Sequence, residues 1–300
     1  MALALRRARA SKHASPGRPQ EVVVLSGGGS LGAAQIGSLR ALFEAGIRPD
    51  AFVGCSVGAL NAAFMAVDPT AERLAELEAI WRKLDRGDIF GRNRRLLASH
   101  PLVHAVRRDD HLYEPDSLRS LVRRWVPVDD LADTAVPCHV VTTDLFTGQP
   151  AWWCDGDPVT VLTASACLPA LFPPVELGGS LHVDGGVVCP VPVERGLELS
   201  AARVWVVDTS GGTLGRRDDR MTALDILLQS FAISRAHLDR PLTGVRPDQR
   251  VVRMRRPDLG RIEMRDFTQT PRLMAAGYAV AKEALALANL PQQRSSARTG

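Results

Sequence analysis

The chain has 300 residues, of which 45% are hydrophobic and 23% are charged, so it can bury a large core and is not disordered as a whole. Its formal net charge of +4 comes from arginines in small scattered clusters, and this modest excess argues against a nucleic-acid-binding protein. The five cysteines include no CxxC pair, so the sequence predicts no zinc site and no thioredoxin-like site.

The first segment, residues 1–20, is rich in Arg, Ala, Ser and Pro, and we expect a disordered basic tail there. A short apolar run precedes the arginines, which is the wrong order for a secretory signal peptide. No stretch approaches the ~20 apolar residues that a membrane-spanning helix needs. We therefore expect a cytoplasmic or peripherally membrane-associated protein without a signal peptide or transmembrane segment.

The next segment, residues 21–60, has the pattern of a strand, a helix and a second strand. A continuous apolar run at Val22–Leu25 is typical of a strand buried on both faces of a parallel sheet. It leads into the glycine-rich loop Gly27–Gly32, after which a helix with a broad apolar face ends at Gly46 and a strand follows at 51–55. This unit predicts the start of a doubly wound α/β sheet.

The rest of the chain alternates between helix and strand patterns around one main domain, residues 21–210. We expect a mobile, Arg- and His-rich cap at 85–113, a C-terminal helical extension at 211–290 that packs on the same domain, and a disordered tail at 291–300. Helices are predicted at 70–84, 115–125, 157–167, 193–199, 224–231 and 271–290. Strands are predicted at 138–143, 151–154, around Val175 and Leu181, at 203–207 and, as an edge strand, at 251–254.

Residues Gly54–Gly58 form a G-x-S-x-G pentapeptide between the second strand and the helix that follows it. A serine on such a sharp turn is lifted clear of the backbone, and the flanking Gly54 and Gly58 allow the turn without a Cβ clash. The new helix points its first N–H groups at the site, where negative charge develops during acyl transfer. Ser56 is therefore a candidate nucleophile, although serine-containing turns between a strand and a helix are common.

The glycine-rich loop allows two interpretations. It matches the G-x-G-x-x-G dinucleotide fingerprint, but that motif needs an acidic residue at the end of the second strand, and here Asp50 precedes the strand. Alternatively, the N–H groups of Gly27, Gly28 and Gly29 form an oxyanion hole beside Ser56, because the carboxyl ends of adjacent parallel strands meet at one edge of a sheet. The coincidence of the loop with the elbow favours catalysis.

A nucleophilic serine needs a base, and the chain offers both histidines and a carboxylate. Six of the seven histidines lie in no recognisable base motif, whereas His182 shares a strand face with Asp184 and is worth testing. The stronger candidate is Asp184, followed by Gly185 and Gly186, although an Asp-Gly pair alone is also typical of a hairpin turn.

Four segments, in this order, resemble the patatin-like phospholipase family. They are the glycine-rich loop that ends at Gly32, the elbow Gly54–Asn61, the segment Ala164–Pro173 with its Ala-Ser and Pro residues, and Asp184–Gly186; the similarity covers roughly residues 20–210. The resemblance implies a three-layer α/β/α patatin-like fold with a mainly parallel central sheet, and it makes the main domain the catalytic one.

The same resemblance implies a serine hydrolase that cleaves carboxylic esters of phospholipids or related lipids through an acyl-serine intermediate. Asp184 would act directly on Ser56 as general base, with Gly27–Gly29 as the oxyanion hole and with no metal or other cofactor. The partner is a lipid ester, and the 85–113 cap is a candidate for peripheral membrane contact and for gating an acyl chain. One departure is Leu31, where the family usually carries Arg or Lys, and it leaves the role of that cation open.

Three other functions remain open on the sequence. An α/β-hydrolase with a Ser-Asp-His triad would use His237 as its base, but that class normally places several strands before its elbow. A dinucleotide-binding protein or a catalytically silent scaffold would also fit parts of the pattern. The sequence predicts neither the lipid, the acyl position, the balance of hydrolysis and acyl transfer, nor the oligomeric state.

Overall fold

The computed structural model describes residues 20–91, 111–209, 226, 229–231, 233–234, 242–256, 259–260 and 262–289. Several predictions therefore lie wholly or mostly outside the described residues. These are the two tails, most of the 85–113 cap, residues 211–225 at the start of the predicted C-terminal extension, and the histidine at position 237.

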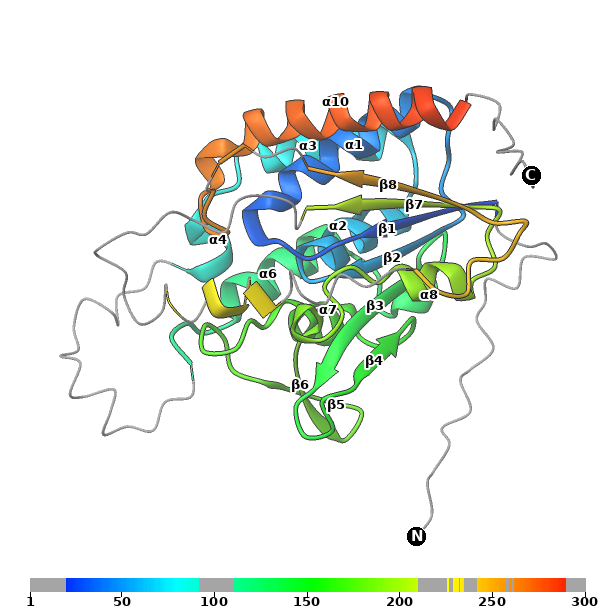
Figure 1. The fold of residues 1–300 in the computed structure, drawn as a ribbon. Helices are drawn as coiled ribbons and strands as arrows, with labels where there is room; N and C mark the ends of the chain where they lie inside the picture. The colour runs from blue at the N-terminus through cyan, green and yellow to red at the C-terminus, as the bar shows by residue number, and fades with distance from the viewer. Residues whose placement is uncertain are drawn as a thin grey trace, which may run out of the picture.

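Among the described residues, eight strands form one mainly parallel sheet at the centre of the molecule (Figure 1). The strand order is β5-β6-β3-β2-β1-β7-β8, and β4 pairs with β3. Pairs β1–β2, β1–β7, β2–β3 and β7–β8 are parallel, whereas β3–β4, β3–β6 and β5–β6 are antiparallel. The strands are β1 (Glu21–Leu25), β2 (Ala51–Cys55), β3 (Cys138–Asp144), β4 (Pro150–Trp153), β5 (Val175–Leu177), β6 (Ser180–Asp184), β7 (Arg203–Asp208) and β8 (Arg250–Arg255).

Helices cover both faces of this sheet, so the predicted three-layer α/β/α architecture is confirmed (Figure 1). In β1, Val23 and Leu25 face a large core shared with most of the helices, while Val22 and Val24 face a smaller core closed by α8. The helices are α1 (Ala33–Glu44), α2 (Val57–Val67), α3 (Ala71–Trp81), α4 (Arg86–Phe90), α6 (Asp116–Trp125), α7 (Pro158–Ala166), α8 (Val193–Glu198) and α10 (Thr270–Asn289).

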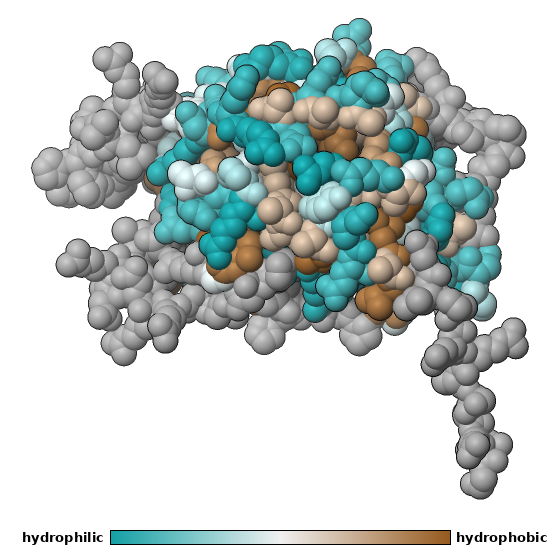
Figure 2. Space-filling view, turned by 90° about the horizontal axis from the view of Figure 1, so that it is seen from above, coloured by the Kyte–Doolittle hydropathy of each residue, from teal (hydrophilic) through white to brown (hydrophobic). Residues whose placement is uncertain are grey.

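The closing helix α10 packs along α1 at very short range. A Cβ added at Gly37 would overlap the carbonyl oxygen of Met274, and one added at Gly277 would overlap that of Ala34. Ser38 Oγ donates to the Gly277 carbonyl at 3.0 Å across the same contact. Seen from above, the outer surface on this side is largely hydrophilic with scattered apolar residues (Figure 2). The helix therefore completes the layer with its glycine-containing inner face.

Local signals at helix and strand ends agree with the predicted elements. Asp157 accepts hydrogen bonds from the N–H groups of Val159 and Thr160, with Pro158 in the first turn of α7. β8 lies at one end of the strand order, as an edge strand must. Of the predicted 85–113 cap, residues 86–90 form the short helix α4, which Asp85 caps by accepting from Gly87 and Asp88.

A buried histidine, His139, lies near the start of β3, away from the carboxyl ends of the parallel strands. His139 is only 8% exposed, and its Nδ1 lies 3.4 Å from a guanidinium nitrogen of Arg195. Burial, with a smaller contribution from the Arg195 charge, lowers the pKa of His139 from 6.5 to about 4. The imidazole is therefore neutral in the folded protein at neutral pH.

This histidine should make the protein sensitive to mild acid. Below pH 6.5 the unfolded chain takes up a proton at His139 while the folded chain does not until about pH 4, so stability is lost as the pH falls through this window. The loss should reach about 2 kcal/mol at pH 5. Urea unfolding between pH 7 and pH 5 should show a steeper loss for the wild type than for His139→Gln, and equal slopes would contradict the assignment.

Candidate active site

The site forms where two strands meet end to end along one edge of β3. Val140 and Val141 of β3 pair with both β2 and β4, so these two strands lie on opposite edges of β3. Thr142 pairs with both β4 and β6, which puts β6 on the same edge as β2. β2 ends with Cys55 opposite Val141, and β6 ends with Asp184 opposite Thr142, the next residue of β3. The carboxyl ends of β2 and β6 therefore point at each other.

This register brings two of the predicted catalytic residues into contact. The hydroxyl of Ser56, the first residue after β2, donates a hydrogen bond to Asp184 Oδ2 at 2.6 Å. Both side chains are buried, with 8% of Ser56 and 1% of Asp184 exposed. A distance of 2.6 Å is at the short end for an O–H···O bond, as is usual when the acceptor is a carboxylate.

Ser56 has the backbone conformation of a strained elbow. Its φ of 54° and ψ of −125° lie outside the regions that non-glycine residues usually occupy. A Cβ added at Gly54 would come within 2.5 Å of the Ala59 backbone, and one added at Gly58 would overlap the Leu25 carbonyl. The two motif glycines are thus required by close backbone contacts.

A second serine holds the elbow from the side of α7. Ser165 Oγ accepts a hydrogen bond from the Ser56 N–H at 3.0 Å and donates to the Val141 carbonyl at 2.7 Å. Ser165 lies in the Ala164–Pro173 segment, whose pattern was noted on the sequence without a role for this residue. Its contacts depend on packing of α7 against β3, which no local pattern reveals.

Each oxygen of the Asp184 carboxylate accepts a hydrogen bond. While Oδ2 accepts from Ser56, Oδ1 accepts from the N–H of Gly186 at 2.7 Å, within the turn that follows β6. A Cβ added at Gly185 would overlap the carbonyl of Val141, so only glycine fits between this turn and β3. The carboxylate is therefore fixed in one orientation toward the serine.

The glycine-rich loop lies beside Ser56, and its three predicted donors differ. A Cβ added at Gly27 would be 3.3 Å from Ser56 Cβ, which places the loop against the elbow. The N–H of Gly27 donates to the Pro190 carbonyl at 2.9 Å and is thus already engaged. The N–H groups of Gly28 and Gly29 have no acceptor among the described residues. Leu31, in the position of the family's usual cation, is buried in the large core.

No described histidine hydrogen-bonds with the Ser56 hydroxyl. His182 is on β6, but its Nδ1 lies 3.0 Å from Thr142 Oγ1 and its ring packs edge-on against Trp153. Burial lowers the pKa of His182, so the ring is neutral at neutral pH.

A predominantly apolar pocket opens at the serine. It has about 650 Å³ of empty space, part of which is continuous with solvent. Arg265 is the one charged side chain among the described residues that line it. Its walls come from several helices and from the segment after α7, and they include Leu60, Trp81, Ile89, Phe90, Leu118 and Phe172.

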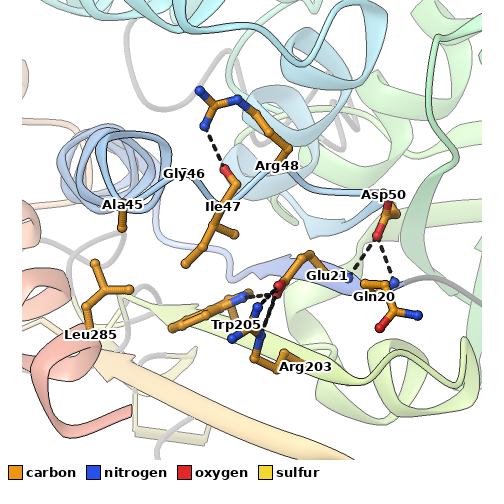
Figure 3. Close-up of a pocket in the computed structure, with 10 residues that line it drawn as sticks. All are labelled: Gln20, Glu21, Ala45, Gly46, Ile47, Arg48, Asp50, Arg203, Trp205 and Leu285. Carbon is orange, nitrogen blue, oxygen red and sulfur yellow. Dashed lines mark hydrogen bonds and ion pairs between the residues drawn. The ribbon is translucent and has the colours of Figure 1, made fainter. Parts of the chain in front are cut away.

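A second pocket lies at the end of the sheet where the parallel strands begin, opposite their carboxyl ends (Figure 3). There Glu21 accepts from the Trp205 indole at 2.6 Å and pairs with Arg203. Asp50 Oδ2 accepts from the N–H groups of Gln20 and Glu21 at 2.7 and 2.9 Å (Figure 3). Asp50 therefore anchors the start of β1, far from the glycine-rich loop, and the acid required for dinucleotide binding is not at the loop.

The part of the chain that the structure describes contains no cluster of three or more His, Cys, Asp or Glu side chains arranged to hold a metal ion. It also contains no helix with the length and apolar character needed to cross a bilayer. Burial, with the nearby Asp184 carboxylate, raises the pKa of Cys167 to about 12, so this thiol stays protonated.

Comparison with known proteins identifies a matching family model and several similar proteins. A family model described as patatin-like phospholipase matches residues 23–196. An uncharacterized NTE family protein of Mycobacterium bovis is 28% identical over 201 residues, which cover 67% of this chain and 52% of the relative. Patatin-like phospholipase domain-containing protein 6 of Homo sapiens is 25% identical over 209 residues, covering 67% of this chain and 14% of that protein.

The chain thus spans about half, or much less, of the length of these relatives. Among solved structures, VipD from Legionella pneumophila gives a TM-score of 0.45 at 15% identity, covering 90% of this chain and 67% of that one.

The Ser165 contacts predict a measurable stability cost. Ser165→Ala would leave the Ser56 N–H and the Val141 carbonyl buried without this partner, at a cost of about 1–3 kcal/mol. Thr163→Val on the same helix is the matched control, since the buried Thr163 hydroxyl has no hydrogen-bond partner in the described part of the chain. Urea unfolding should separate the two variants, and equal stabilities would contradict a structural role for Ser165.

Proposed function

The chain belongs to the patatin-like phospholipase family, and from this premise we propose that it is a serine lipid acyl hydrolase in which Ser56 and Asp184 form a catalytic dyad. The observation that carries the proposal is the direct 2.6 Å hydrogen bond from the Ser56 hydroxyl to the carboxylate, on a strained elbow beside unpaired glycine N–H groups. Nucleophile, base and oxyanion donors are the three parts that acyl transfer requires.

In the first half of the proposed cycle, Ser56 Oγ attacks the ester carbonyl carbon while its proton passes to Asp184 Oδ2. The carbonyl oxygen becomes an oxyanion, which we assign to the N–H groups of Gly28 and Gly29 and to the N-terminal end of α2. Gly27 contributes geometry, because its own N–H is bonded to Pro190. Collapse breaks the ester C–O bond, and the proton on Asp184 goes to the departing alcohol.

In the second half, water attacks the acyl-serine, and the same carboxylate takes its proton. The tetrahedral intermediate then releases the fatty acid and regenerates the Ser56 hydroxyl. The bond from Gly186 to Oδ1 keeps Oδ2 directed at the serine throughout both halves. Because the site is buried, water competes weakly for the carboxylate, which strengthens its interaction with the serine proton.

The pocket suggests which part of the substrate is recognised. Apart from Ser56 and Arg265, the described side chains that line it are apolar, so it suits an acyl chain whose carbonyl lies at Ser56. This supports esters of long-chain fatty acids, including phospholipids.

The beginning of the 85–113 cap contributes to this wall. Ile89 and Phe90 of α4 line the pocket, and Phe90 stacks on Phe172 with ring centroids 5.6 Å apart. Tyr113, at the other end of the cap, lies 5.2 Å from Phe90 by ring centroids. We propose that the cap gates the acyl chain at a lipid surface, with these aromatic contacts fixing its two ends.

The first experiment is labelling with a fluorophosphonate, which reacts with activated serines. The wild type should be labelled and Ser56→Ala should not. Asp184→Asn should lower kcat on a lipid ester by about 10²–10⁴-fold, because it removes the base. Full activity of Asp184→Asn would contradict the dyad.

Two further variants distinguish the dyad from a histidine-dependent triad. His182→Ala and His237→Ala should each keep labelling and kcat within a few-fold of the wild type, since neither imidazole takes a proton in the proposed cycle. A loss in either variant comparable to that of Asp184→Asn would favour a triad.

The acyl-chain assignment makes a separate prediction. Ile89→Trp adds bulk to the pocket wall on α4 without touching the dyad, so long-chain esters should lose about tenfold in kcat/KM relative to short-chain esters. Leu287→Trp, on the exposed face of α10, is the control and should leave the ratio unchanged. An unchanged ratio in Ile89→Trp would mean that the acyl chain binds elsewhere.

A further inference from the structure

A buried threonine contacts the glycine-rich loop from behind. Thr209 directly follows β7 and is fully buried. Its hydroxyl donates to the Gly27 carbonyl at 2.8 Å, and a Cβ added at Gly28 would lie 2.5 Å from the same hydroxyl oxygen. Thr209 therefore contacts the loop at Gly27, which lies against Ser56, and at Gly28, whose N–H has no acceptor among the described residues.

Because a peptide unit is planar, the contact at the Gly27 carbonyl also affects the direction of the next N–H group, that of Gly28. The carbonyl of Gly27 and the N–H of Gly28 belong to one planar trans peptide unit, so they point in opposite directions. Holding the carbonyl on Thr209 turns the Gly28 N–H away from the threonine. In the same way, the Gly28 carbonyl accepts from the Leu31 N–H at 3.2 Å, which fixes the direction of the Gly29 N–H.

Thr209 is itself held in place by a buried polar network. Its N–H donates to Ser26 Oγ at 2.8 Å, and the two hydroxyls lie 3.1 Å apart. The preceding residue, Asp208, has a fully buried side chain that pairs with Arg253 at 2.8 Å on the neighbouring strand β8. On the far side of the loop, Gln35 donates to the Ser26 carbonyl at 2.7 Å. These hydrogen bonds fix the position of the Thr209 hydroxyl.

We propose that Thr209 is a positioning residue that aims the Gly28 N–H at the oxyanion of the transition state. The inference rests on the proposed function and adds a residue to it. Thr209 does not touch the substrate, since the loop lies between it and Ser56. Its loss should therefore reduce stabilisation of the transition state while leaving binding of the acyl chain intact.

The test compares Thr209→Val, which replaces the hydroxyl by a methyl group of similar size, with Thr209→Ser, which keeps it. Thr209→Val should lower kcat on a short-chain ester about 10- to 100-fold with KM within twofold, and should slow fluorophosphonate labelling in parallel. Thr209→Ser should restore kcat to within a few-fold. Thr163→Val, another buried threonine but one whose hydroxyl has no partner among the described residues, should retain wild-type kcat.

The possible outcomes distinguish a failure of the Thr209 role from a failure of the proposed function. If the wild type is labelled at Ser56 but Thr209→Val keeps its kcat, or raises only KM, the positioning role is wrong and the dyad stands. If the wild type is not labelled, the proposed function itself fails. If Thr209→Val does not fold by circular dichroism, Ser26→Ala replaces it: kcat lowered severalfold at constant KM supports the inference, and unchanged kcat overturns it.

Discussion

The site depends on one constraint of the sheet, the end-to-end meeting of β2 and β6 on a single edge of β3. Because β2 runs parallel to β3 and β6 runs antiparallel to it, consecutive β3 residues, Val141 and Thr142, face the last residues of the two strands. The turn after each strand then begins in the same small volume. Ser56 and Asp184 thus meet although 128 positions separate them in the chain. The elbow, the Gly185–Gly186 turn and the Ser165 contacts all stabilise this junction.

The glycine-rich loop is connected to the pocket by a buried chain of polar side chains. Gln35, which bonds the Ser26 carbonyl, accepts from Asn61 at 2.8 Å, and Asn61 in turn accepts from the Trp81 indole at 2.9 Å. These groups come from three different helices, so each helix is held in register with the loop. The ring of Trp81 also forms part of the pocket wall. The pocket wall and the loop are therefore joined by buried hydrogen bonds that are costly to leave unpaired.

Local patterns predicted much of this structure, and the parts they missed are non-local. The apolar run before Gly27, the elbow at Ser56 and the Asp157 cap each depend on neighbouring residues, so the sequence carries them directly. The order of strands does not follow from such patterns, since β6 and β8 reach their partners only through the packed sheet. The same limit applies to the loop. Spacing identified three glycine N–H groups, but it did not reveal that the Pro190 carbonyl engages the first or that Thr209 donates to the carbonyl of Gly27.

The direct contact between Ser56 and Asp184 also affects how the proposed reaction depends on its base and on its oxyanion donors. An imidazole cannot stand between two oxygens that are 2.6 Å apart, so the proposed mechanism passes the serine proton directly to the carboxylate. A carboxylate is a weaker base than the imidazole of a triad, and it must therefore be compensated by stronger stabilisation of the oxyanion. In the proposed mechanism that stabilisation comes from the N-terminal end of α2 and from two backbone N–H groups whose directions are set by the peptide planes of the loop. The residues that fix those planes then contribute to the proposed reaction together with the pair that exchanges the proton.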